Sequence, residues 1–257
     1  MEKHIGDTHT IENITLLALA IAMMMVHFQF FHGGYFGYDE LEYCHLAHQL
    51  IRGDFEHSNN LYAYRYVGFL PLAGSYILLG VNDFANFIVT VVAAIAILFF
   101  VLKLLPSVGF FAKGLSVLLL ICNPIHLLYL EKPMPDVWVE LGFLLCFYSY
   151  YRIRFTLPLN ITAFSLLFVG GAVLIFLAKE TFLIFYPYFL VLLVVDVFKK
   201  QRLQFWIQSI SGILIFIIIY LFIYQIIFEN AFARVEAISI IGIFLNVLTN
   251  YNLSAYY

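Results

Sequence analysis

The residues best suited to chemistry lie in one polar segment of an otherwise apolar chain. Asp39 and Glu40 follow a glycine-rich exit from the first apolar run, and Arg65 precedes the point where the chain becomes apolar again. Ionisable groups at a membrane surface are costly to desolvate, so a cluster of them indicates function. A partly buried carboxylate here could serve as a general base for an acceptor hydroxyl. The alternative is an acidic pair that only stabilises a helix start.

Two further segments bring charged residues to the ends of apolar runs. Arg65 could neutralise a phosphate, or it could anchor to lipid headgroups. In the segment EKPMPD, Lys132 could pair with a phosphate and Asp136 could orient it or bind a metal. Lys179 could contact a phosphate, and Glu180 could support Lys179 in that role. For both segments the alternative is an ordinary turn between helices, with Lys179 and Glu180 paired to each other.

Histidine and cysteine spacing gives weak signals. His45 and His48 are three residues apart, but no matched cysteine or aspartate spacing accompanies them, so interfacial histidines are favoured over a metal site. The three cysteines, Cys44, Cys122 and Cys146, provide no disulfide or metal framework.

Composition places the chain among integral membrane proteins. It is 63% hydrophobic and 11% charged, with a mean hydropathy of +0.94, whereas soluble domains are about 25% charged. No basic block suggests nucleic acid. The first apolar run lacks a cleavage pattern, so it is expected to be retained as a helix. No linker or internal repeat divides the sequence, which predicts a single membrane domain over residues 1–257.

The elements that must position these residues follow from the lengths of the apolar runs. A membrane core of about 30 Å needs about 20 helical residues. The sequence therefore predicts an all-α, polytopic transmembrane bundle of about seven spans. They are Ile14–Phe31, Phe84–Leu104, Phe110–Leu130, Val137–Tyr151, Ile161–Ala178, Phe182–Phe198 and Phe205–Phe228.

Residues 61–80 are apolar but are interrupted by an arginine, a proline and three glycines, so they are predicted to lie at the surface or to insert only partly. Residues 39–52 are predicted to form an amphipathic interfacial helix in the first outer loop. Asp39 would cap its start, and Leu41, Cys44 and Ala47 would form part of its apolar face.

The distribution of lysine and arginine tests the orientation. With the N-terminus inside and residues 61–80 not spanning, eight of the 13 basic residues lie inside and five outside. With the N-terminus outside and residues 61–80 spanning, the count is nine inside and four outside, so charge alone leaves both arrangements open. The first arrangement is favoured because it brings Asp39, Lys132 and Lys179 onto one face of the membrane.

The order of these features over roughly residues 10–200 resembles the N-terminal half of GT-C superfamily glycosyltransferases. The branch concerned contains protein O-mannosyltransferases and bacterial aminoarabinose transferases, and is glycosyltransferase family 39-like. The resemblance rests on the first span and on the segments YDELEYCHLAHQLIRGDF, YRYVGFLPLAGSYILLGVNDFANF, EKPMPD and FLAKETFLIFYP.

That resemblance implies an enzyme that moves a sugar from a polyprenyl-phosphate-linked donor to a hydroxyl of a lipid, glycan or protein acceptor. The reaction would occur on the outer face of a membrane, here the bacterial inner (plasma) membrane. The first-loop carboxylate of the family, catalytic or metal-associated, corresponds to Asp39, with Glu40 beside it. The basic residue late in that loop, which contacts the lipid phosphate, corresponds to Arg65. The sequence YRYVGFLPL replaces the usual Lys-Pro-Pro-like run there, which leaves the subfamily open.

The remaining site residues complete the expected picture. Lys132 and Lys179 are further phosphate-binding candidates, Asp136 and Glu180 would support them, and a divalent metal ion is an optional cofactor. Family members continue through several more spans, so the chain, which stops at Tyr257, is expected to be a truncated form or to need a partner subunit.

The alternative is a non-enzymatic polytopic membrane protein: a lipid-carrier transporter or a subunit of an envelope assembly. Transporters place charges near the midplane, often in two related halves. Here the charges gather at the ends of spans and no half is repeated, which favours the enzyme.

Overall fold

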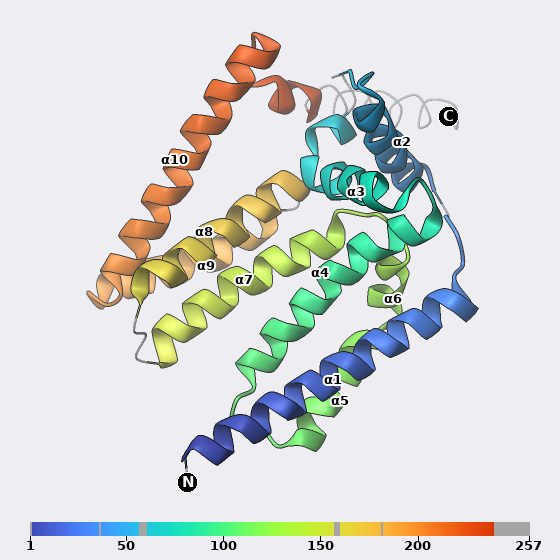
Figure 1. The fold of residues 1–257 in the computed structure, drawn as a ribbon. Helices are drawn as coiled ribbons and strands as arrows, with labels where there is room; N and C mark the ends of the chain where they lie inside the picture. Colours follow the sequence, from blue (N-terminus) through green and yellow to red (C-terminus); the bar gives the residue numbers. More distant parts are fainter. Residues whose placement is uncertain (1, 36, 57–60, 157–159, 181, 239–257) are drawn as a thin grey trace, which may run out of the picture.

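The computed structural model describes residues 2–35, 37–56, 61–156, 160–180 and 182–238, and every regular element within these ranges is a helix (Figure 1). Ten α-helices and one short 3₁₀ helix follow one another along the described chain up to Phe228, and residues 233–238 are helical as well. Their bounds are α1 Glu2–Phe31, α2 Tyr38–Arg52, η1 Leu61–Tyr64, α3 Tyr66–Leu79, α4 Asp83–Leu104, α5 Phe110–Ile121, α6 Pro124–Leu130, α7 Asp136–Phe155, α8 Ile161–Ala178, α9 Phe182–Phe198 and α10 Leu203–Phe228.

Four of these helices are long and apolar enough to cross a membrane: Thr10–Phe31 within α1, and the whole of α4, α8 and α10. The pair α5 and α6 would make a fifth span if it crosses as one broken helix. The all-helical class is therefore confirmed, and the long apolar helices indicate an integral membrane protein. Six of the seven predicted spans each lie within one helix, and Phe110–Leu130 covers two, α5 and α6. Crossing by α7 and α9 stays a prediction.

The predicted span Phe110–Leu130 is not one straight helix, and its crossing as a broken span stays a prediction. The chain bends by 64° between α5 and α6. Pro124 has no amide hydrogen and disfavours helical geometry in the residue before it. Asn123 instead accepts a hydrogen bond from the Ile125 amide (3.0 Å) and starts a new helix.

The polar segment after α1 folds as a helix, as the sequence predicts, but the predicted N-cap and part of the predicted apolar face are wrong. Gly34 takes a left-handed φ of 73°, which turns the chain out of α1. Gly37, and not Asp39, is the N-cap of α2, so Asp39 lies in the first helical turn. Leu41 is 53% exposed instead of lying on the apolar face. The buried face carries Tyr43 and Ala47, which pack with residues of α3. An interfacial position for α2 stays a prediction.

The ambiguous segment 61–80 forms η1 and, for most of its length, α3. The 14 residues of α3 would span about 21 Å, short of a membrane core. Gly68 allows α2 and α3 to approach closely, because a Cβ at this position would lie 2.5 Å from the Tyr43 ring. This contact fixes Tyr43 beside Arg65, the N-cap of α3.

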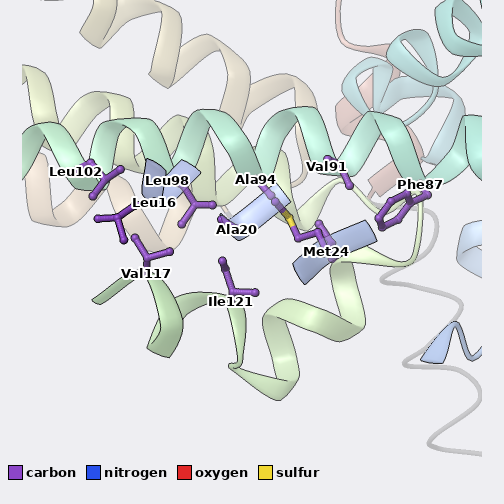
Figure 2. Packing of buried hydrophobic residues seen from close by; sticks show 11 residues of the cluster. Leu16, Ala20, Met24, Phe87, Val91, Ala94, Leu98, Leu102, Val117 and Ile121 are labelled. Carbon is purple, nitrogen blue, oxygen red and sulfur yellow. The ribbon is translucent and has the colours of Figure 1, made fainter. Parts of the chain in front are cut away.

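The long helices pack through small and apolar side chains. Figure 2 shows residues of α1, α4 and α5 meeting, among them Ala20, Leu98 and Ile121. Helices α7 and α8 lie so close that a Cβ at Gly171 would be 2.5 Å from the Gly142 carbonyl oxygen. This bundle holds the loops at its ends in fixed positions.

At the end of the bundle where α1 begins, polar contacts join neighbouring helices. Lys113 at the start of α5 pairs with Glu12 (3.4 Å). The buried carboxylate of Asp196 at the end of α9 accepts from Arg202 (2.7 Å) and from Trp206 at the start of α10 (3.0 Å). Lys103, Arg152 and the pair Lys199 and Lys200 also end helices here, whereas α2 and α3 lie at the opposite end (Figure 1). The arrangement agrees with an inside N-terminus and a non-spanning α3.

This topology predicts opposite labelling of two cysteines placed in a cysteine-free chain. Leu41→Cys on α2 should react with a membrane-impermeant maleimide in intact cells, because residue 41 is 53% exposed and lies at the predicted outer end. Gln201→Cys, exposed between α9 and α10, should react only after permeabilisation. Labelling of both positions from the same side would contradict the topology.

Candidate functional site

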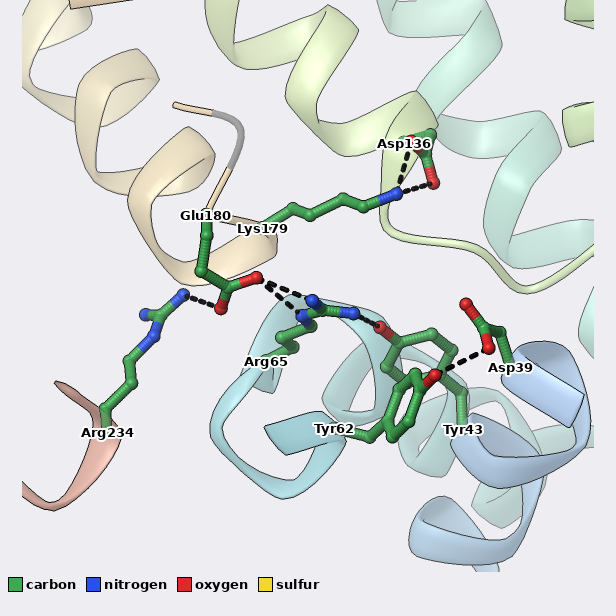
Figure 3. Close-up of polar contacts among 8 residues, drawn as sticks. All are labelled: Asp39, Tyr43, Tyr62, Arg65, Asp136, Lys179, Glu180 and Arg234. Carbon is green, nitrogen blue, oxygen red and sulfur yellow. Dashed lines mark hydrogen bonds and ion pairs between the residues drawn. The ribbon is translucent and has the colours of Figure 1, made fainter. Parts of the chain in front are cut away.

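The centre of the candidate site is a carboxylate shared by two arginines. Glu180, just after α8, accepts from Arg65 Nε (3.0 Å) and Nη2 (2.6 Å) through Oε2. Its other oxygen accepts from Nη2 of Arg234 (3.1 Å), which lies after α10 (Figure 3). The N-cap of α3, the residues that follow α8 and the segment after α10 therefore meet at one carboxylate.

The electrostatics of this group leave a surplus of positive charge. Burial alone would raise the pKa of Glu180, but the hydrogen bonds and charges of Arg65 and Arg234 lower it below its ordinary value of 4.5. The carboxylate is therefore ionised at neutral pH, and two cations share one anion. Nη1 of Arg234 is buried and has no hydrogen-bond partner among the described residues. The group can accordingly offer a donor and a net positive charge to an anion.

Two tyrosines connect Arg65 with the predicted base. Tyr62 Oη donates a 2.6 Å hydrogen bond to Asp39 Oδ1, and the Arg65 guanidinium lies 5.3 Å from the centre of the Tyr62 ring. Tyr43 Oη accepts from Arg65 Nη1 (3.2 Å). Burial and the Asp39 hydrogen bond raise the pKa of Tyr62 to about 12, so its hydroxyl stays protonated and donates. Asp39 is thus oriented by Tyr62 through one oxygen.

Lys179 and Glu180 are adjacent but do not pair with each other, which corrects the turn interpretation. Lys179 Nζ lies 3.0 and 3.3 Å from the two carboxylate oxygens of Asp136 at the start of α7. Both side chains of this pair are about one-quarter exposed. The pair is therefore accessible, and Lys179 could exchange Asp136 for an anionic ligand.

Glu40 and Lys132 form a buried pair beside the site. Glu40 Oε2 accepts from the Gly37 amide (3.1 Å), and Oε1 lies 3.7 Å from Lys132 Nζ. The two residues are 5% and 4% exposed. This geometry holds the start of α2 against the segment before α7. It suits a positioning role, while catalysis by Glu40 and phosphate binding by Lys132 stay predictions.

The structure thus gathers all seven predicted site residues at one end of the bundle, as three neighbouring ion pairs and the Asp39–Tyr62 pair. Sequence reasoning missed Tyr43, Tyr62 and Arg234. Arg234 had a detectable signal, since no other lysine or arginine follows Arg202. The tyrosines had none, because tyrosine is common throughout this chain.

Metal binding finds no support in the part of the chain that the structure describes. There, no group of three or more histidine, cysteine, aspartate or glutamate side chains is arranged to hold an ion. The optional divalent ion stays a prediction.

Fold and site together define a multi-pass helical membrane protein with a charged cluster where its helices end. Comparison with protein-family models, curated proteins and solved structures found no match.

Proposed function

We propose that the protein is a membrane glycosyltransferase that takes a sugar from a polyprenyl-phosphate-linked donor. The observation that carries the proposal is the meeting of Asp39, oriented by Tyr62, with the surplus positive charge of Arg65, Glu180 and Arg234. A carboxylate base next to a phosphate-attracting group is what this transfer requires. The charges lie at helix ends and not in mid-bundle, which favours the enzyme over a transporter.

In this mechanism, Asp39 accepts the proton of the acceptor hydroxyl through its Oδ2, the oxygen that Tyr62 leaves open. The hydroxyl oxygen forms a bond to the anomeric carbon, and the bond from that carbon to the phosphate oxygen breaks. The electron pair of the broken bond stays on the lipid phosphate. Arg65, Arg234 and Lys179 stabilise the charge that develops there, with Lys179 released from Asp136.

An apolar pocket supports a lipid donor. A cavity of about 280 Å³ is lined by Phe176 of α8, Tyr186 of α9 and Ile217 of α10, among others. The guanidinium of Arg234 lies 4.9 Å from the centre of the Phe176 ring. The apolar lining of the cavity is therefore in contact with Arg234, which suits a donor with a hydrocarbon tail and a phosphate head.

The test is a transfer assay with the purified chain in liposomes. Radiolabelled polyprenyl-phosphate mannose and polyprenyl-phosphate aminoarabinose serve as donors, with total membrane lipid and protein as acceptors. We expect label to move from one donor to an acceptor fraction. Binding of polyprenyl phosphate alone is measured in parallel, so that lack of a partner subunit or acceptor is recognised. The proposal would be contradicted if the chain showed no transfer and also did not bind polyprenyl phosphate.

A further inference from the structure

A second cavity, with several polar side chains in its lining, lies next to the candidate site, between α6 and the start of α7. Its volume is about 330 Å³, at the lower end of the range for small-ligand pockets. Its polar lining comes from Asn123, His126, Tyr129, Asp136 and Glu140. Asp136 is shared with the Lys179 ion pair, so the cavity adjoins the proposed donor-phosphate site.

His126 supplies an acceptor that lacks a donor. The residue is 7% exposed, and its Nδ1 lies 3.4 Å from Glu140 Oε2. A carboxylate at this position favours the proton on Nδ1, which leaves Nε2 with a lone pair. Nε2 is buried and has no hydrogen-bond partner among the described residues. A buried polar atom of this kind indicates a missing partner.

The other polar groups of the cavity are also chiefly acceptors. Asp136 and Glu140 are one turn apart on α7, and Glu140 is open to the outside. The break at Asn123 and Pro124 places non-helical backbone at the same cavity. In an apolar segment such a break is tolerated where it lines a polar cavity. A ligand with several donors would therefore satisfy this site.

We propose that this cavity binds a hydroxyl-rich ring of the glycosyl acceptor, that is, a carbohydrate. Hydroxyls are favoured over an ammonium group because Lys179 neutralises Asp136 as long as no donor phosphate has drawn it away. Sugar hydroxyls would donate to His126 Nε2 and Glu140, while Tyr129 and the apolar wall of the cavity face the carbons of the ring. The assignment to the acceptor rests on the proposed transferase function.

Saturation-transfer NMR on the full chain in nanodiscs tests this assignment, with methyl α-mannopyranoside and n-butylamine as probes. We expect saturable binding of the glycoside in the millimolar range. Glu140→Gln should weaken it by about 10-fold or more, because a hydrogen bond to a charged acceptor is lost. His126→Phe should do the same, and His45→Gln, at an exposed position on α2, should not.

Three outcomes would overturn the inference: no glycoside signal, equal glycoside binding by the Glu140→Gln variant, or preferential binding of butylamine. Glu140 is partly exposed, so its variant is expected to fold even if the His126 variant does not. Polyprenyl phosphate binding by Glu140→Gln should be unchanged. Loss of glycoside binding with intact lipid binding therefore locates the defect in this cavity. Failed transfer with intact glycoside binding counts against the proposed function and not against the cavity.

Discussion

Replacement of Asp39 by asparagine should lower the rate of sugar transfer by about 10²–10⁴-fold, the usual contribution of a positioned general base. Asparagine keeps the size of the side chain and an oxygen that can accept the Tyr62 hydrogen bond. It cannot take the proton of the acceptor hydroxyl. The loss should therefore appear in turnover, with the fold and the binding of polyprenyl phosphate retained.

The transfer assay on wild-type and variant chains measures this effect, and lipid-phosphate binding gives the matched readout. Asp54→Asn is the control, because Asp54 is exposed and pairs only loosely with Arg52 (3.5 Å). It should leave turnover unchanged. A variant with Asp39→Asn that transfers sugar at the wild-type rate would remove Asp39 from the mechanism and leave it as a helix-start residue.

The sequence predicted where helices lie better than it predicted how they begin and end. Apolar length is a local property, and six of the seven predicted spans each lie within one helix. Cap choice depends on the approach of the chain: the extended backbone of Gly37 precedes α2, so Glu40 reaches back to its amide and Asp39 is left for Tyr62. The Asn123-Pro124 signal was present in the sequence, but the continuous apolar composition on both sides outweighed it.

The site residues were predicted as a set, while their pairing was not. Topology brings loop residues to one end of a bundle, and that follows from counting spans. The choice of partner depends on packing in three dimensions. Arg65 and Glu180 are 115 residues apart, yet they form the shortest arginine–carboxylate contact of the site. Lys179, adjacent to Glu180 in sequence, instead reaches Asp136.

The Arg65–Glu180 contact gives the second large expected effect. Arg65→Met keeps much of the apolar stem but leaves Glu180 with Arg234 alone. The side chains of Arg65 and Glu180 are 11% and 19% exposed, and breaking a buried pair from one side costs about 3–5 kcal/mol. We expect a loss near the lower end, about 3 kcal/mol, because Arg234 still compensates part of the charge. Unfolding titrations in mixed micelles measure it.

The Arg65→Met/Glu180→Gln double variant tests how far Arg234 depends on the same carboxylate. It leaves Arg234, which is 4% exposed and bonded to Glu180, as a buried cation without this partner, so the lost stability should not return. Binding of polyprenyl phosphate should stay weakened in both variants, since the guanidinium that faces the phosphate is absent from each. Arg52→Ala, which removes an exposed arginine, should change stability by less than about 0.5 kcal/mol.

The pH dependence of this group follows from the lowered pKa of Glu180. A carboxyl whose folded pKa is depressed stabilises the fold above its unfolded pKa, and this contribution is lost as pH falls through the folded value. The difference in the free energy of unfolding between wild type and Arg65→Met should therefore persist from pH 7 to about pH 5 and become smaller only at lower pH. If the double variant binds the phosphate lipid as tightly as wild type does, the role of Arg65 is only to stabilise the fold. The donor phosphate would then have to be held by Arg234 and Lys179.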